Sequence, residues 1–307
     1  MTEPRPKRFD RAVDGILLLG KPQGLSSNAA LQRARGLFRA LKAGHAGSLD
    51  PLATGMLPVC FGQATKVCGY LLHSRKTYQV AALLGIKTDS ADADGQVIEQ
   101  QPVPGFNEAK LHSVLQGFMG AQQQVPPMVS ALKHQGRRLY ELARSGESVE
   151  RAPRDIVIEQ LTLLAFTANT LEFEVRCSKG TYVRSLVEDI AASLGTVGHV
   201  TLLRRTQVEP FDAGRMISLD RLAELPLPEL DALLLPADSA LAEMPELALD
   251  AAHTSQLFHG KPLTGLAGVS AGLWRAYGPE QRFLGIVRCD ESAVVRAERL
   301  FSDQSNP

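Results

Sequence analysis

The stretch His45-Ala46-Gly47-Ser48-Leu49-Asp50-Pro51-Leu52-Ala53-Thr54-Gly55-Met56-Leu57-Pro58 carries a single carboxylate, Asp50, between two glycines and directly before a proline. Gly47 and Gly55 allow sharp turns, because glycine reaches backbone conformations that are closed to other residues. Pro51 fixes its own φ and biases Asp50 away from the helical region. An isolated Asp-Pro is usually only a turn. Here we expect a rigid loop that presents one acid to a cavity. The apolar side chains that would pin it to a core are Leu49, Leu52, Met56 and Leu57.

The flanking segments predict strands and helices. Residues 13–19 form a short apolar run that is typical of a buried strand. Residues 26–28 can cap an amphipathic helix whose apolar face continues to Leu41, with arginines mostly on the other face. Residues 77–86 alternate with a period of two, as in a half-buried strand.

The second half of the chain continues this mixed pattern. Asn107 can cap a helix that runs to Gly120, and residues 181–194 carry the clearest helical stripe, ended by Gly195. Residues 156–166 and 171–177 are predicted as two strands around a turn. Because strands and helices do not alternate regularly, the fold class is α+β, with a mixed, mainly antiparallel sheet.

A change in composition predicts two domains. Residues 225–245 are rich in Leu, Ala, Pro and acids and are interpreted as a connecting region. Past Leu249 the chain becomes Gly-rich and strand-like. We therefore expect a catalytic domain at residues 1–248 and a small β-rich domain at residues 249–307, which 307 residues can accommodate.

Composition indicates a cytoplasmic globular protein. Hydrophobic residues make up 44% and charged residues 21% of the chain, enough for a sizeable core. The polar, basic start is followed by no apolar signal region, and no apolar run is long enough to span a bilayer. The four cysteines form no Cys-x-x-Cys pair, which favours reduced, packed thiols over a zinc site.

The net charge of zero conceals an asymmetry. Residues 1–80 carry 12 basic and 4 acidic side chains, a net charge of +8, and residues 131–154 carry 6 and 3, a net charge of +3. Residues 216–307 carry 7 basic and 13 acidic side chains, a net charge of −6. A basic front with an acidic tail suits a polyanion-binding face, although solvated basic helices are also common.

Two segments resemble motifs of other functions but lack the side chains that those functions require. Residues 15–22 nearly match a P-loop, but Pro22 follows Lys21, so the hydroxyl that would bind Mg²⁺ is missing. Residues 89–95 resemble a calcium loop, but both anchoring carboxylates are missing, and we interpret the segment as an Asp-rich turn between strands. The histidines never pair at metal-ligand spacing.

Five segments together resemble the TruB family of tRNA pseudouridine synthases, in the family's order and over roughly residues 13–215. Residues 44–58 with 62–66 resemble its catalytic signature. The other matching segments are residues 15–28, residues 76–78 with 84–85 and 88–89, residues 126–133 with 138–140, and residues 177–185 with 199 and 203–206. One match could be coincidence, but all of them together are a specific signal. The compact length resembles the bacterial stand-alone enzymes of this family.

The resemblance implies a catalytic role for Asp50 as nucleophile or base, by attack at C1′, attack at C6 or removal of a ribose proton. It implies that Arg184 pairs with Asp50 and holds it ionised, since an adjacent cation lowers the pKa of an acid by ~1–3 units. Without the resemblance, Arg184 would be interpreted as a surface residue of a helix. Tyr78 would otherwise be a half-buried core residue, but it matches the family's active-site tyrosine, which stacks on uracil and is a candidate to remove the C5 proton.

Further positions match the family's substrate pocket. Tyr182 and Leu203 match residues that line the uridine site, and the alternative for each is ordinary packing. His45 matches a position proposed to fill the gap left by an extruded base. Lys21 and Pro22 match residues that brace the active-site loop.

The implied substrate is the T-arm uridine of tRNA, uridine 55 of the TΨC loop, which must flip out of the folded RNA before reaction. Residues 126–155 resemble the family's RNA-gripping loop, and the terminal domain resembles a PUA-type RNA-binding module more loosely. The reaction involves no redox change and no net hydrolysis, so it implies no cofactor and no metal. We expect a monomer that needs no membrane and no protein partner.

Two alternatives stay open at this point. The first is a non-catalytic protein that binds or folds tRNA, which would release unmodified RNA. The second is a nucleoside hydrolase or glycosidase, which would release free uracil. A single candidate carboxylate argues against the two-carboxylate geometry of most glycosidases.

Overall fold

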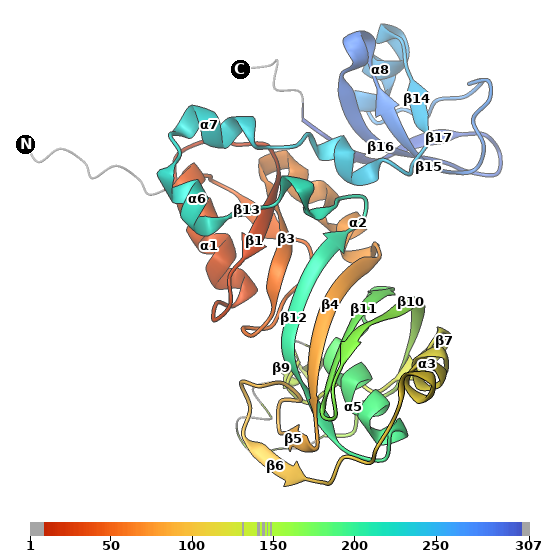
Figure 1. Ribbon diagram of the computed structural model, residues 1–307. Coiled ribbons are helices and arrows are strands. Elements are labelled where there is room, and N and C mark those ends of the chain that lie inside the picture. Colours follow the sequence, from red (N-terminus) through yellow and green to blue (C-terminus); the bar gives the residue numbers. More distant parts are fainter. Residues whose placement is uncertain are drawn as a thin grey trace, which may run out of the picture.

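The structure is a computed structural model, and it describes residues 9–130, 132–139, 142, 145, 147 and 149–302. Figure 1 shows a large sheet with helices packed on it and a smaller β-rich unit at the C-terminal end. The predicted α+β class with a mainly antiparallel sheet is confirmed. Ala131 and Tyr140, which belong to the matching segments, lie outside the described residues, as do residues 1–8 and 303–307.

The large sheet has nine strands in the order β13-β1-β3-β12-β4-β11-β10-β7, with β2 paired to β3. Neighbouring strands run antiparallel except for β1 with β13 and β3 with β12. The strands are β1 (Gly15–Lys21), β2 (Ala43–His45), β3 (Thr54–Phe61), β4 (Lys76–Leu84), β7 (Gly120–Gln124), β10 (Arg154–Phe166), β11 (Thr170–Cys177), β12 (Gly198–Val208) and β13 (Ile217–Ser218).

The remaining strands form a four-stranded sheet, in the order β14-β15-β16-β17, and two hairpins. The sheet contains β14 (Glu246–Ala248), β15 (Gly272–Tyr277), β16 (Phe283–Cys289) and β17 (Val295–Leu300). The hairpins are β5 (Ile86–Thr88) with β6 (Val97–Gln100), and β8 (Lys133–His134) with β9 (Arg137–Arg138). The first hairpin encloses the predicted Asp-rich turn.

The helices pack mainly on the large sheet. The α-helices are α1 (Ser27–Phe38), α2 (Cys68–His73), α3 (Glu108–Gln116), α5 (Val183–Ser193), α6 (Leu219–Glu224), α7 (Leu227–Ala232) and α8 (Ala251–Phe258). Short 3₁₀ turns are η1 (Gly62–Val67), η2 (Ala213–Arg215), η3 (Ala237–Leu241) and η4 (Pro279–Gln281).

The first half of the sheet is buried on both faces, which explains why β1 has a continuous apolar sequence. Leu17 and Leu19 pack with α1, α6 and α7 on one face. Ile16 and Leu18 pack with η1, α2 and η3 on the other face. In the second half, α3 and α5 cover one face of β4, β10, β11 and β12, and apolar residues alternate with exposed ones along β11.

The loop that contains Asp50 (residues 46–53, here the Asp50 loop) lies where the two halves meet. It leaves β2 and enters β3, which pairs with the first half of the sheet. Its residues Leu49, Leu52 and Ala53 pack instead into the core of the second half, beneath α5. The loop therefore connects the two cores, and both fix its position.

Two sequence predictions need correction. The first helix ends at Phe38 because Arg39 takes a left-handed conformation with φ 53°, so Leu41 lies beyond the helix and is 55% exposed. The predicted connecting region, residues 225–245, contains α7 and η3, whose Leu230 and Leu241 are buried. The apolar residues of this segment contribute to the cores of the large sheet.

Candidate active site

The Asp50 loop turns sharply at two glycines. Gly47 has φ 92° and Gly55 has φ 97°, conformations that side chains rarely adopt. A Cβ at Gly55 would lie 2.2 Å from the carbonyl oxygen of Arg205, so a larger residue has no room. The prediction that these glycines shape the loop is confirmed.

Hydrogen bonds anchor the loop to the start of α1. The Ser27 hydroxyl accepts from the Leu49 amide at 2.7 Å and donates to the Leu49 carbonyl at 3.0 Å. The Pro51 carbonyl accepts from the Gly24 amide at 2.8 Å and from the Lys21 ammonium at 3.3 Å. Asp50 is thus held between two residues whose backbones are bonded to β1 and α1.

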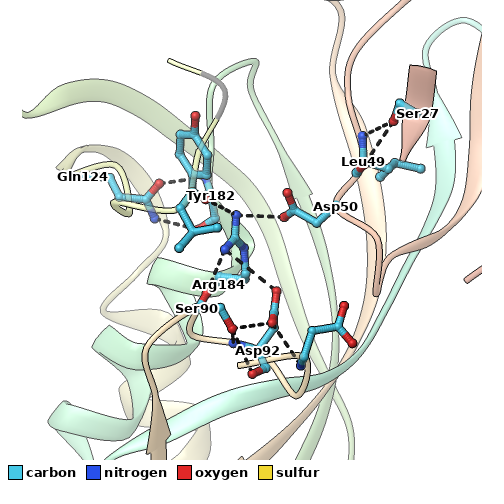
Figure 2. A network of polar contacts seen from close by, with 10 residues as sticks. Ser27, Leu49, Asp50, Ser90, Asp92, Gln124, Tyr182 and Arg184 are labelled. Atoms are coloured by element: carbon cyan, nitrogen blue, oxygen red, sulfur yellow. Dashed lines mark hydrogen bonds and ion pairs between the residues drawn. The ribbon is translucent and has the colours of Figure 1, made fainter. Parts of the chain in front are cut away.

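Arg184, in the first turn of α5, forms an ion pair with Asp50 at 2.9 Å between Nη2 and Oδ2. Its side chain is 3% exposed, while that of Asp50 is 40% exposed. The guanidinium also donates to the carbonyls of Ser90 at 2.7 Å and Val129 at 2.8 Å, and Asp92 Oδ2 lies 3.8 Å from Nη1. Figure 2 shows the guanidinium between Asp50 and the turn that carries Asp92. A buried cation therefore aims a carboxylate that substrate can reach.

The pKa of Asp50 departs from the expectation of a lowered value. Burial raises the pKa of this carboxyl above its ordinary value, and the Arg184 cation opposes the rise. The charge of Asp92 adds to the rise. The predicted lowering by Arg184 is present but is outweighed, because the atoms packed around the acid desolvate it more strongly than one guanidinium, shared with a second carboxylate, compensates.

Two tyrosines lie near Asp50. Tyr78 is on β4, paired with Val175 on β11 and Arg205 on β12. Tyr182 is the residue before α5, and its backbone exchanges two hydrogen bonds with the Gln124 side chain, at 2.8 and 3.0 Å. Burial raises the pKa of both tyrosines, and the charge of Asp50 raises each further.

The other predicted site residues surround this centre at different depths. Leu203 on β12 is 7% exposed and packs in the same core as Leu49 and Leu52 of the Asp50 loop. His45 ends β2 opposite Val59, and its Nδ1 is buried without a partner among the described residues. Burial, with the Arg205 cation, lowers the pKa of His45.

Lys21 is the last residue of β1, and Pro22 follows it. The buried Lys21 ammonium donates to the carbonyls of Pro22, Leu25 and Pro51 at 2.9, 2.7 and 3.3 Å. Burial lowers the pKa of Lys21 to about 8, and the Asp50 charge opposes this. Pro22 itself is exposed and contributes only its carbonyl to this network. The structure thus brings Lys21 to the Asp50 loop, while Pro22 acts through its backbone.

Sequence reasoning missed three residues of the site. Asp92 lies in the segment that the sequence predicts as an Asp-rich turn between strands, a pattern that gives no sign of its contact with Arg184. Gln124 carried no motif signal, and its pairing with the Tyr182 backbone joins β7 to α5. Arg205 lay inside a matching segment, but the segment gives no sign that its side chain is 1% exposed beneath the Asp50 loop.

The segment expected to grip RNA, residues 126–155, is described except at positions 131, 140, 141, 143, 144, 146 and 148. It carries the β8–β9 hairpin, and the exposed Arg137 pairs with Glu147 at 3.2 Å. At its near end the Val129 carbonyl binds Arg184. The segment therefore begins at the candidate active site.

The described residues form no metal centre, membrane-spanning helix or disulfide. No group of three or more His, Cys, Asp or Glu side chains is arranged to hold a metal ion there. In the same part of the chain, no helix is both long and apolar enough to cross a bilayer. The four cysteines are unpaired.

Solved structures with a similar fold identify the fold of this chain. The crystal structure of a Cbf5-Nop10-Gar1 complex matches with a TM-score of 0.74 and 23% identity, over 94% of this chain and 85% of that chain. The crystal structure of an archaeal box H/ACA sRNP Nop10-Cbf5 complex matches with a TM-score of 0.72 and 21% identity, over 99% of this chain and 94% of that chain. The chain thus has the pseudouridine synthase fold with a β-rich C-terminal unit.

Sequence comparisons give the family. Residues 35–183 match the model of the TruB family pseudouridylate synthase N-terminal domain. Residues 184–242 match the tRNA pseudouridylate synthase B C-terminal domain, and residues 245–301 match the pseudouridine synthase II TruB C-terminal model. The chain belongs to the TruB family of pseudouridylate synthases.

Two relatives are similar over nearly their full length. The tRNA pseudouridine synthase B of Chromohalobacter salexigens is 47% identical, over 97% of this chain and 98% of its own. The tRNA pseudouridine synthase B of Nitrosococcus oceani is 46% identical, over 98% of this chain and 99% of its own. The family resemblance predicted from the motifs is confirmed.

Proposed function

We propose that this chain converts a uridine of tRNA to pseudouridine, at position 55 in the T arm, with Asp50 as the nucleophile. The observation that carries the proposal is the ion pair of a 40% exposed Asp50 with a 3% exposed Arg184. A carboxylate that is accessible on one side and held by a buried cation on the other suits attack on a bound nucleotide. The names of the relatives supply the RNA class, tRNA.

The reaction balances without any added reagent. The bond between uracil N1 and ribose C1′ breaks, the base turns, and C5 bonds to C1′. The proton on C5 leaves to solvent, and N1 takes up a proton. Since the product is an isomer of the substrate, the residues of the site need only stabilise charge, hold the base and move one proton.

The remaining site residues have roles that fit their positions. Tyr78 and Tyr182 would hold the flipped base close to Asp50, and Leu203 would form the apolar wall of the pocket. Tyr78 would also take the C5 proton. Stacking and hydrogen bonds in such a pocket offset the few kcal/mol that unstacking a base costs. His45 would stack in the space left by the base, and Lys21 would keep the loop in place.

We assign catalysis to residues 1–248 and additional RNA contact to residues 249–307. Strand β14 (Glu246–Ala248) lies at the end of the first part and pairs with β15 of the small sheet, so the linker between the two parts is short. The segment 126–155 would hold the RNA backbone, since phosphate contacts position a nucleic acid without reading its sequence. The enzyme would act as a monomer, with no cofactor and no protein partner.

The test is to map pseudouridines in an unmodified tRNA transcript by carbodiimide treatment and reverse transcription, with and without the protein. The proposal predicts one new stop, at position 55. Bound but unmodified tRNA would instead support the non-catalytic alternative, and free uracil would support a hydrolase. A stop at another uridine would keep the reaction and overturn the position.

A further inference from the structure

Arg205 has the largest fully buried side chain of the described residues, and this side chain donates hydrogen bonds to the backbone on both sides of Asp50. On β12 it is 1% exposed. Its Nε donates to the Met56 carbonyl at 2.7 Å, and its Nη2 donates to the Gly47 carbonyl at 3.0 Å. These carbonyls lie on opposite sides of Asp50 in sequence. One planar guanidinium therefore fixes the entry and the exit of the loop.

The backbone of Arg205 contributes to the same contact. It pairs in parallel with Gly55, where β3 begins, and leaves no space for a side chain at that position. A Cβ on Gly47 would lie 3.4 Å from Nη1 of Arg205, so the guanidinium also packs closely against the entry of the loop. Strand and side chain together determine where Asp50 lies.

The charge of Arg205 is not met by a carboxylate within the part of the chain that the structure describes. A buried cation without a counter-ion costs free energy, even where backbone carbonyls solvate it. A neutral side chain would fill the same space at lower cost. Retaining a charge here points to a use for it at the active site.

The residue on which this charge acts is Tyr78, which pairs with Arg205 directly across strands β4 and β12. A bulge in β12 follows Arg205, and bulges re-aim neighbouring side chains. Side chains of residues paired across antiparallel strands lie close together, and the Arg205 cation lowers the pKa of the Tyr78 hydroxyl against the rise that burial causes. Because arginine carries only donors, the phenol oxygen can act toward it only as an acceptor.

We propose that Arg205 is a positioning residue, whose single guanidinium fixes the Asp50 loop beside Tyr78, the residue opposite it across β4 and β12. The proposal rests on the proposed function, since it explains how nucleophile and base are held relative to each other. Lysine would keep the charge but not the planar fork that binds two carbonyls at once. Arg205→Lys is therefore the informative substitution. Arg204→Lys is its matched control, because Arg204 is the adjacent residue on β12 and is exposed.

Three properties of each variant are to be measured: the affinity for a tRNA transcript labelled with tritium at uridine C5, the single-turnover rate of tritium release, and amide hydrogen exchange along the chain. For Arg205→Lys we expect RNA affinity near that of wild type but a release rate lower by about 100-fold, the effect of misplacing reacting groups by about 1 Å. Exchange should accelerate in residues 44–57 and not across the sheet. Arg204→Lys should match wild type in all three.

A release rate for Arg205→Lys equal to that of Arg204→Lys would overturn the proposal, as would faster exchange spread over the whole sheet. If Arg205→Lys does not fold, Gly47→Ala disturbs the same contact from the loop side and should give the same loss of rate with retained affinity. If wild type releases no tritium, the proposed function fails. The exchange pattern of residues 44–57 still decides whether Arg205 holds the loop.

Discussion

At Arg184, one guanidinium serves two carboxylates of different exposure. The Asp50 side chain is 40% exposed and that of Asp92 is 6% exposed. The two backbone carbonyls of Ser90 and Val129 hold the guanidinium in place independently of either acid. Asp92 is buried, with its Oδ2 3.8 Å from Arg184 Nη1, so its charge raises the pKa of Asp50 while its carboxylate is not accessible to substrate. We infer that Asp92 adjusts the acidity of Asp50.

Asp92→Asn should therefore shift the acid side of the pH–rate profile. Asp50 must be ionised to act, so the rate falls as pH drops through its pKa. The charge of Asp92 raises the pKa of Asp50, and removing that charge lowers it. The midpoint of the acid side should then move to lower pH, as measured by single-turnover tritium release. Asp89→Asn, an exposed residue of the same turn, should leave the midpoint in place. An upward shift for Asp92→Asn would contradict this account.

Lys21→Met gives a stability prediction at the same scale. The substitution removes the ammonium donor from three carbonyls, of which that of Pro51 keeps its bond from the Gly24 amide, and a buried carbonyl left unpaired costs about 1–3 kcal/mol. We expect the free energy of unfolding in urea to fall by about 2–4 kcal/mol. A loss below about 0.5 kcal/mol, the size of a typical surface substitution, would mean that Lys21 does not brace the loop.

Among the elements, β1 and β11 could be predicted from the sequence because burial on two faces or one face leaves a continuous or alternating apolar pattern. The end of α1 could not, since the apolar spacing continues to Leu41 while the chain turns at Arg39. The resemblance to the TruB family predicted Asp50 and Arg184 as site residues. The roles of Asp92 and Arg205 depend on contacts between segments more than 90 residues apart, which no local pattern encodes.

The start of β3 gives a prediction for the elements. Gly55→Ala combines an unfavourable φ, at about 1–2 kcal/mol, with a Cβ that meets the Arg205 carbonyl oxygen at 2.2 Å. We expect a loss of more than about 3 kcal/mol in urea unfolding. Gly180→Ala has a similar φ, 81°, with open space around the Cβ, and should lose only about 1–2 kcal/mol. Equal losses would show that the contact with β12 is not required.

For the whole molecule, the small sheet shares a core with the large one. Ile286 of β16 is 0% exposed and packs in the cluster that contains Ile16, Met56 and Cys60. The Lys66 ammonium donates to the Leu300 carbonyl at 2.7 Å across the same junction. A shared apolar core couples the unfolding of both units. The RNA contact assigned to the C-terminal unit therefore acts from a fixed position relative to the active site.

Unfolding followed by two probes tests this coupling. Trp274, the single tryptophan, lies on β15 and reports the small sheet, while far-UV circular dichroism reports the whole chain. The two urea transitions of wild type should coincide. Ile286→Ala should lower both midpoints together, by about 2–5 kcal/mol of stability. A fluorescence transition that precedes the other in wild type would show that the units unfold separately.

The most direct measurement compares tritium release from C5-labelled tRNA for wild type, Asp50→Asn and Glu172→Gln. Glu172 is an exposed acid on β11 and controls for the loss of one negative charge. We predict that Glu172→Gln matches wild type, while Asp50→Asn binds tRNA but releases tritium about 10⁴-fold more slowly or not at all. Release by Asp50→Asn at a rate within about tenfold of wild type would contradict a catalytic carboxylate at this position.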